Sequence, residues 1–232
     1  MFLIQINEVL MQQRVEIVNK AFFEQLNDAV FLIKCSEDIP YGEGAFSRQA
    51  IITSILCLES AANCFMYAIP CTKAMKIALD KLSLVDKYEY LYMSIIESKS
   101  INRGSPYFQK LSELVKIRNK YVHSKPSSEI LPPNEISKPV LDDEKSQYLK
   151  LPIDPQSWQI KDAKNVVKYV CDFIDHFLID LCEFPPSYST NFLITTLYSG
   201  DESFWLLDEN KKDTIKYLRE SIGAKVRFFE AN

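Results

Sequence analysis

The chain has 232 residues, enough for one domain or for one domain with an extension, and 47% of them are hydrophobic and 25% charged, as in folded globular proteins. The net charge of −4 lacks the basic excess of proteins that coat nucleic acid, although it is compatible with an enzyme that binds one phosphate locally. The five glycines form neither a P-loop nor a dinucleotide-binding motif, which excludes the phosphate-cradling loops of those folds.

The six cysteines form no C-x-x-C pair and match no zinc-binding spacing, so we expect neither a metal nor a cofactor. Cys57 and Cys64 lie seven residues apart in one apolar segment and are expected in the core. The N-terminus lacks the features of a secretory signal, and no apolar run reaches membrane-spanning length. We therefore expect a protein of the reducing cytoplasm that does not contact a membrane.

The first third of the chain is predicted to form two long helices. Residues 1–6 fit either a short strand or an apolar lead-in, and the spacing of apolar residues predicts one helix over 8–34. A loop over 36–44 contains one proline and two glycines. The segment 46–69 is apolar almost all round, which indicates a central, buried helix.

Two polar residues, Glu59 and Asn63, interrupt this central helix four residues apart, on one face. A buried carboxylate without a partner is costly, so Glu59 predicts a cation nearby, and Ala61 and Ala62 allow another helix to approach closely. The partner that we expect is Arg118. If this pair is buried, Glu59→Ala strands a cation and should cost roughly 3 kcal/mol.

Two shorter amphipathic helices follow, over 72–84 and 86–98, before a loop over 99–106. Three tyrosines at alternate positions of the second helix can stack nucleic-acid bases, but such tyrosines more often pack with only the hydroxyl in water. We favour packing for Tyr88, Tyr90 and Tyr92.

A helix with one buried face is predicted over 107–123, and prolines flank it at both ends. Its last turns contain Arg118, Asn119 and His123. Asn119 and His123 are four residues apart and share a face, and the long guanidinium of Arg118 can reach the same space. Cations in a last turn also complement the helix dipole without any further role, and this simpler interpretation stays open.

Six prolines over 124–156 preclude a continuous helix, so we expect a long loop that begins beside His123 and either walls a site or contacts a partner. Short extended pieces are expected near 139–142 and 147–151. A strong final helix is predicted over 157–183, with Ser157 or Asp154 as its cap. It contains His176, the only other histidine, which is expected at the surface or core edge. His176 is the second candidate for a general acid in any catalysis by this chain.

Two consecutive prolines, Pro185 and Pro186, mark a boundary between residues 1–183 and a C-terminal extension, residues 184–232. The extension is too short to fold alone and is expected to pack on the helices. Its predicted elements are strands or extended apolar segments over 192–198 and 204–207, a helix over 213–222 that ends at Gly223, and a strand over 225–229.

The segment from Arg118 to His123, RNKYVH, resembles the R-x4–6-H motif of the HEPN superfamily. The Glu59 and Asn63 pattern is similar to the polar pair that many members place opposite their Arg and His, and the likeness covers roughly residues 10–183. This resemblance implies an all-α bundle of four to six helices, here with a small mixed C-terminal extension.

Many HEPN proteins are metal-independent endoribonucleases, often toxins or phage-defence effectors. By this resemblance His123 is the general base on a ribose 2′-hydroxyl and Arg118 stabilises charge on the phosphate, leaving a 2′,3′-cyclic phosphate. Asn119 and Glu59 would orient them, with Asn63 in support.

Lys120 and Lys125 would bind the RNA substrate. The resemblance also implies a homodimer and an antitoxin or other regulatory protein as partner, but Lys125 stands where some toxins carry a tyrosine that an antitoxin modifies. The alternative is a non-catalytic module that binds RNA, a nucleotide or a protein. A positive cleft at His123 would favour the nuclease, and a sealed neutral one the module.

Overall fold

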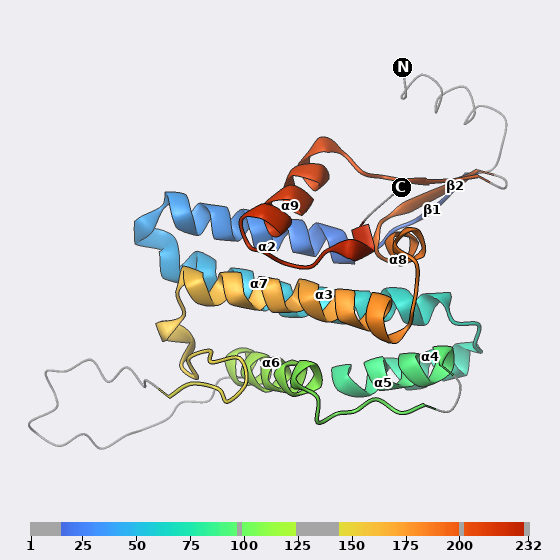
Figure 1. Ribbon diagram of the computed structural model, residues 1–232, viewed down its shortest axis with the longest axis horizontal. Helices are drawn as coiled ribbons and strands as arrows, with labels where there is room; N and C mark the ends of the chain where they lie inside the picture. The colour runs from blue at the N-terminus through green and yellow to red at the C-terminus, as the bar shows by residue number, and fades with distance from the viewer. Residues whose placement is uncertain (1–14, 97–98, 124–143, 200–201, 230–232) are drawn as a thin grey trace, which may run out of the picture.

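The computed structural model describes residues 15–96, 99–123, 144–199 and 202–229, which are mostly helical and carry one small antiparallel sheet (Figure 1). The helices lie in three layers (Figure 1). The first has α2 and α9, the middle has α3 and α7, and the third has α4, α5 and α6.

The core is built by α2 (Ala21–Asp38), α3 (Glu43–Ala68) and α7 (Ile160–Asp175), which pack against one another. The predicted central helix over 46–69 is confirmed, and α3 begins three residues earlier, after the short 3-10 turn Pro40–Gly42. Small side chains on α3 allow the close approach to its neighbours. The buried alanines of α3 are Ala50, Ala61 and Ala62.

By length and mean hydropathy alone, the segment Pro40–Ala68 would pass as a membrane-spanning helix, contrary to the sequence-based expectation. However, 56% of its most apolar stretch is buried inside the protein. A central bundle helix has this property because it must be apolar on every face that meets another helix.

The third layer consists of α4 (Lys73–Asp80), α5 (Leu84–Ile95) and α6 (Pro106–Val122), close to the predicted ranges. Aromatic rings join this layer to α7 and to the helical turn that follows it: Tyr88 meets Phe173 and Phe177 at 4.8 and 4.9 Å between centroids, edge to face. The hydroxyl of Tyr88 donates to the Leu58 carbonyl oxygen at 2.8 Å. The expectation of packing for Tyr88 is therefore confirmed, and Tyr90 and Tyr92 lie partly buried against the core.

The sheet joins the two ends of the described chain. Its order is β1 (Val15–Val18), β2 (Thr196–Ser199), β3 (Glu202–Trp205), all antiparallel, with Ile17 opposite Leu197. The single helix predicted over 8–34 is therefore wrong at 15–18, because pairing with β2 satisfies the backbone of this β-branched segment as a strand. Residues 1–14, and with them the expectation for 1–6, lie outside the described residues.

The predicted strand over 192–198 starts late, because Pro185 and Pro186 begin an unpredicted helix, α8 (Pro186–Leu193). Helix α9 (Glu209–Glu220) starts before the predicted 213, capped by Asp208, and Gly223 follows it with a left-handed φ of 66°.

The strand predicted over 225–229 is wrong. The backbone N–H groups of Lys225 and Arg227 donate to the carboxylates of Asp172 and Asp175 on α7, at 2.7 and 2.8 Å, instead of pairing with a strand. The segment ends in a 3-10 turn, η4 (Arg227–Phe229), whose aromatic rings pack on Phe22 and Phe23. We call residues 223–229 the C-terminal strap, which runs beside α7 in Figure 1.

Residues 124–143 of the predicted long loop, with the piece at 139–142, lie outside the described residues. The extended piece expected at 147–151 is instead a turn, because the N–H groups of Tyr148 and Leu149 both donate to the carboxylate of Glu113 on α6, at 2.9 and 2.8 Å.

The final bundle helix starts later than predicted. Asp154 caps only the 3-10 turn Pro155–Ser157, and Gln159 with Asp162 caps α7. After Asp175 the helix continues as a π-helix, η3 (His176–Leu181).

Candidate functional site

The predicted pair forms: the Arg118 guanidinium on α6 donates from Nη2 to Oε1 of Glu59 on α3, across 59 residues of sequence. The pair is partly exposed, since 23% of the Arg118 side chain and 34% of the Glu59 side chain are accessible. The cost of roughly 3 kcal/mol that we predicted for Glu59→Ala assumed a buried pair, so it does not apply to this partly exposed one. Arg118 Nε is buried and has no hydrogen-bond partner among the described residues.

Asn119 and His123 lie beside this pair at the end of α6. Arg118 Nη1 donates to Asn119 Oδ1 at 3.2 Å, and the backbone N–H of His123 donates to the Asn119 carbonyl oxygen at 3.0 Å. His123 is the C-cap residue, and both side chains are exposed. We call Glu59, Arg118, Asn119 and His123 the α6 cluster.

Of the other predicted site residues, one lies near His123, one lies elsewhere, and one is outside the described residues. Asn63 is exposed and accepts a hydrogen bond from Lys87 Nζ on α5 at 3.0 Å, so the structure places it against α5 and not with Arg118. Lys120 is exposed on the same face of α6 as His123, three residues away, and Lys116 precedes it by one turn. Lys125 lies outside the described residues.

His176 belongs to a second group. Its ring stacks on Tyr107 at 4.1 Å between centroids, and its Nδ1 lies 3.1 Å from Asp180 Oδ2. Eleven residues of helix separate Tyr107 from Arg118, about 16 Å along the axis. The alternative acid is thus held away from the α6 cluster.

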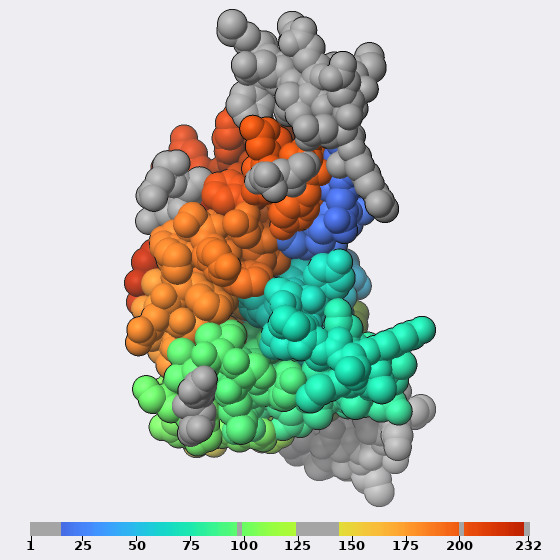
Figure 2. Space-filling model, turned by 90° about the vertical axis from the view of Figure 1, so that its right-hand side faces the viewer, coloured from blue at the N-terminus to red at the C-terminus, as the bar shows by residue number. Residues whose placement is uncertain are grey.

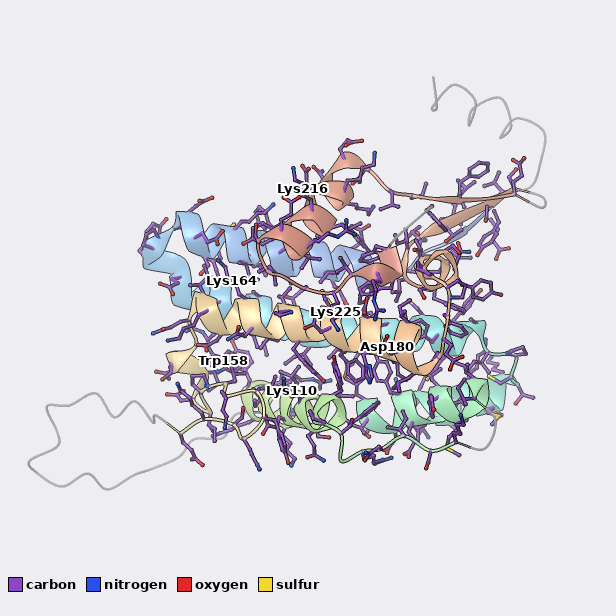
Figure 3. The ribbon with its side chains drawn as sticks, viewed as in Figure 1. Lys110, Trp158, Lys164, Asp180, Lys216 and Lys225 are labelled. Carbon is purple, nitrogen blue, oxygen red and sulfur yellow. The ribbon has the colours of Figure 1, made fainter. Side chains whose placement is uncertain are left out.

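Arg227 of the C-terminal strap completes this second group. It donates from Nη2 to Asp180 at 2.8 Å and to Asp175 at 2.5 Å, and from Nε to Asp175 at 2.9 Å (Figure 3 labels Asp180 and, on the strap, Lys225). We call Asp175, His176, Asp180 and Arg227 the α7 cluster.

Charge and burial compete at Asp180: burial alone would raise its pKa, but hydrogen bonds from Arg227 and His176 outweigh it and lower the pKa. The hydrogen bonds that Arg227 donates to Asp175 and Asp180 raise the pKa of its guanidinium above the usual value. The sequence alone did not reveal this cluster. The i, i+4 spacing of His176 and Asp180 was the only local signal, and Arg227 is 47 residues beyond Asp180.

Cys57 and Cys64 are unsuited to nucleophilic chemistry. Cys57 is buried in the core as expected, and Cys64 is partly buried. Burial raises the pKa of the Cys64 thiol to about 11 and that of Cys57 well above its usual range, so both stay protonated at neutral pH. Within residues 15–96, 99–123, 144–199 and 202–229, no three His, Cys, Asp or Glu side chains are grouped to hold a metal ion.

Comparison with known proteins adds no relative from which a role could be transferred. No protein-family model matches the chain, and no curated protein or solved structure matches it. The resemblance to HEPN proteins therefore rests on the residues of α3 and α6.

Proposed function

We propose that the chain is a HEPN-like, metal-independent endoribonuclease whose site is the α6 cluster. The observation that carries the proposal is the ion pair between Glu59 and Arg118, which joins two helices and fixes a guanidinium at the end of α6 where His123 is open to solvent. A guanidinium held in one orientation is suited to a phosphate, and an accessible imidazole is suited to proton transfer.

The reaction follows from these groups. His123 accepts the proton of a ribose 2′-hydroxyl, the 2′-oxygen attacks the adjacent phosphorus, and the 5′-oxygen leaves with a proton from an acid. Arg118 stabilises the charge that develops on the phosphorus oxygens, while Glu59 and Asn119 hold its two terminal nitrogens. The exposed Lys116 and Lys120 lie on the His123 side of α6 and would attract the RNA backbone.

A homodimer would supply the acid. Two copies that place their α6 ends together bring the partner's His123 to the leaving oxygen, so that one histidine acts as base and the other as acid. A regulatory protein such as an antitoxin would inhibit the enzyme by covering this end of α6.

The test is cleavage of end-labelled RNA by purified protein with chelator present. Wild type is expected to leave 2′,3′-cyclic phosphate ends. Because Arg118 and His123 act in one transition state, His123→Ala and the double variant Arg118→Ala/His123→Ala should both lose cleavage, to about the same extent. His176→Ala is the matched control and should cleave as wild type does. Intact RNA with wild type, or cleavage by His123→Ala, contradicts the proposal.

A second function is supported by the charge balance at Arg118. Its positive charge faces the carboxylate of Glu59, as in a structural ion pair, and this favours a non-catalytic module that binds RNA, a nucleotide or a protein. For such a module, wild type leaves every RNA intact, and substitutions at Lys116 and Lys120 weaken ligand binding without any effect on RNA integrity.

A further inference from the structure

A groove runs along the C-terminal end of α3, where β1, α8 and the end of α5 meet. It consists of two adjoining hollows of about 690 and 430 Å³ that share their central lining residues. These are Glu16, Val18, Lys20, Cys64 and Tyr67. In Figure 2, which looks at this side of the molecule, the surfaces of β1 (blue), α8 (orange) and α4–α5 (teal) meet.

Exposed aromatic rings line the groove. Tyr67, Tyr188 and Tyr198 are 62%, 56% and 37% accessible, although each contributes to its wall. Phe184 and Phe192 lie beneath, and Phe192 meets Tyr188 edge to face at 5.6 Å. Aromatic rings that stay open on one face are the platforms on which single-stranded nucleic acids stack their bases.

Lys20 lines the groove, Lys76 and Lys87 contact residues of its lining, and all three lysines have neutral partners. Lys20 Nζ donates to the Asn191 carbonyl oxygen and to Thr196 Oγ1, Lys76 Nζ lies 5.1 Å above the Tyr67 ring, and Lys87 donates to Asn63. By contrast, Arg103, Arg118 and Arg227 are all paired with carboxylates.

The lysine charges are therefore not cancelled by a carboxylate partner within the described residues. Glu16 is the one acid in the lining of the two hollows. Burial lowers the pKa of Lys20, and a bound anion would offset that penalty. An ammonium has three donors, so Lys20 keeps one for such a ligand.

Helix α3 connects the groove to the α6 cluster, because it carries both Glu59 and the groove residue Tyr67. Glu59, Asn63 and Tyr67 occupy successive turns on one face of α3, so Tyr67 lies about 12 Å along the axis from Glu59, the reach of a few nucleotides. The Cys64 thiol in the groove stays protonated, which argues against a reactive cysteine there.

We propose that this groove binds the unstacked bases of single-stranded RNA, with Tyr67 as a stacking platform and Lys20, Lys76 and Lys87 contacting phosphates. The choice of RNA rests on the proposed nuclease function, whereas the stacking and the lysine contacts rest on the groove itself. Duplex RNA hides the faces of its bases and cannot use the tyrosines.

The test is fluorescence anisotropy of wild-type protein with a labelled ten-nucleotide 2′-fluoro RNA, which lacks the attacking hydroxyl and stays intact. Tyr67→Ala should weaken binding about tenfold, because a lost stacking contact is of this size. Tyr67→Phe keeps the ring and should bind within about twofold of wild type. Tyr41→Ala removes a tyrosine that is 97% exposed but lies before α3, and should change nothing.

Salt dependence tests the lysines separately. Lys87→Gln should reduce the slope of log Kd against log salt by about 0.7, the value for one phosphate contact on a single strand. Binding that is undetectable, unchanged in Tyr67→Ala, or equal for duplex and single strand overturns the inference. A single-stranded DNA of the same sequence is the second probe. If it binds as tightly as the RNA, the groove is a stacking site for single strands in general and has no preference for RNA.

This outcome is independent of cleavage. If wild type leaves RNA intact but Tyr67→Ala weakens binding, the groove stands and the nuclease proposal fails. If wild type cleaves RNA and Tyr67→Ala changes neither binding nor KM, the nuclease stands and the groove fails.

Discussion

Two clusters in this protein each combine an arginine and a histidine with carboxylate, but their surroundings differ. In the α6 cluster, Glu59 and Arg118 are both partly exposed and His123 is open to solvent. In the α7 cluster, Asp175 has no exposed surface and accepts three hydrogen bonds from Arg227, including one from its backbone.

This difference in burial predicts that the α7 cluster contributes more to stability than the α6 cluster does. Water around a partly exposed pair screens its attraction, so the pair contributes little to stability, and its guanidinium stays accessible from solvent. A carboxylate without water must keep its arginine, because an unpaired buried charge is costly. The α7 cluster therefore fastens the C-terminal strap to α7, and the α6 cluster stays available.

The largest effect is expected at Arg227. Arg227→Met removes two side-chain donors from buried Asp175 and should lower the free energy of unfolding by about 3 kcal/mol. Urea denaturation measures this change. Adding Asp175→Asn removes the stranded charge and should recover part of the loss. A loss below about 1 kcal/mol would show that the two clusters do not differ in the way that burial implies.

A smaller effect is expected at Glu59. Glu59→Ala breaks a partly exposed pair and should cost about 1 kcal/mol or less, in contrast to the larger cost for a buried pair. The same urea measurement, with Arg118→Met as the matched variant from the other side of the pair, checks it. If Glu59→Ala is as destabilising as Arg227→Met, the α6 cluster is structural and its availability to a substrate is contradicted.

The smallest effect is a change in acid stability at Asp180. Its pKa lies below the ordinary value of 3.8, so folding favours the charged form. The resulting stabilisation is complete above that ordinary value and is lost as the pH falls through the lowered folded pKa. Between pH 5 and 2.5, Asp180→Asn should therefore lose less stability than wild type. If the free energy of unfolding changes with pH in the same way for both proteins, Asp180 does not form the ion pairs that we assign to it in the α7 cluster.

Local pattern located most helices because it reflects burial directly. The apolar recurrence of 107–123 and the apolar run of 46–69 correspond to α6 and α3, and the need of Glu59 for a cation led to Arg118. The same reasoning placed Asn63 with that pair, but spacing on one helix does not reveal which neighbouring helix a side chain faces. Lys87 of α5 donates a hydrogen bond to Asn63 instead.

The amino-acid sequence by itself determined which segments bury a face and which polar groups need a partner, since both follow from periodicity and desolvation within one segment. The tertiary structure alone decided that residues 15–18 are a strand, because their pairing partner is near the other end of the chain. It also decided that residues 225–229 are not a strand, because carboxylates of α7 take their backbone N–H groups. Whether these segments form strands depends on contacts distant in sequence, because a backbone N–H group is satisfied equally by a neighbouring strand or by a carboxylate.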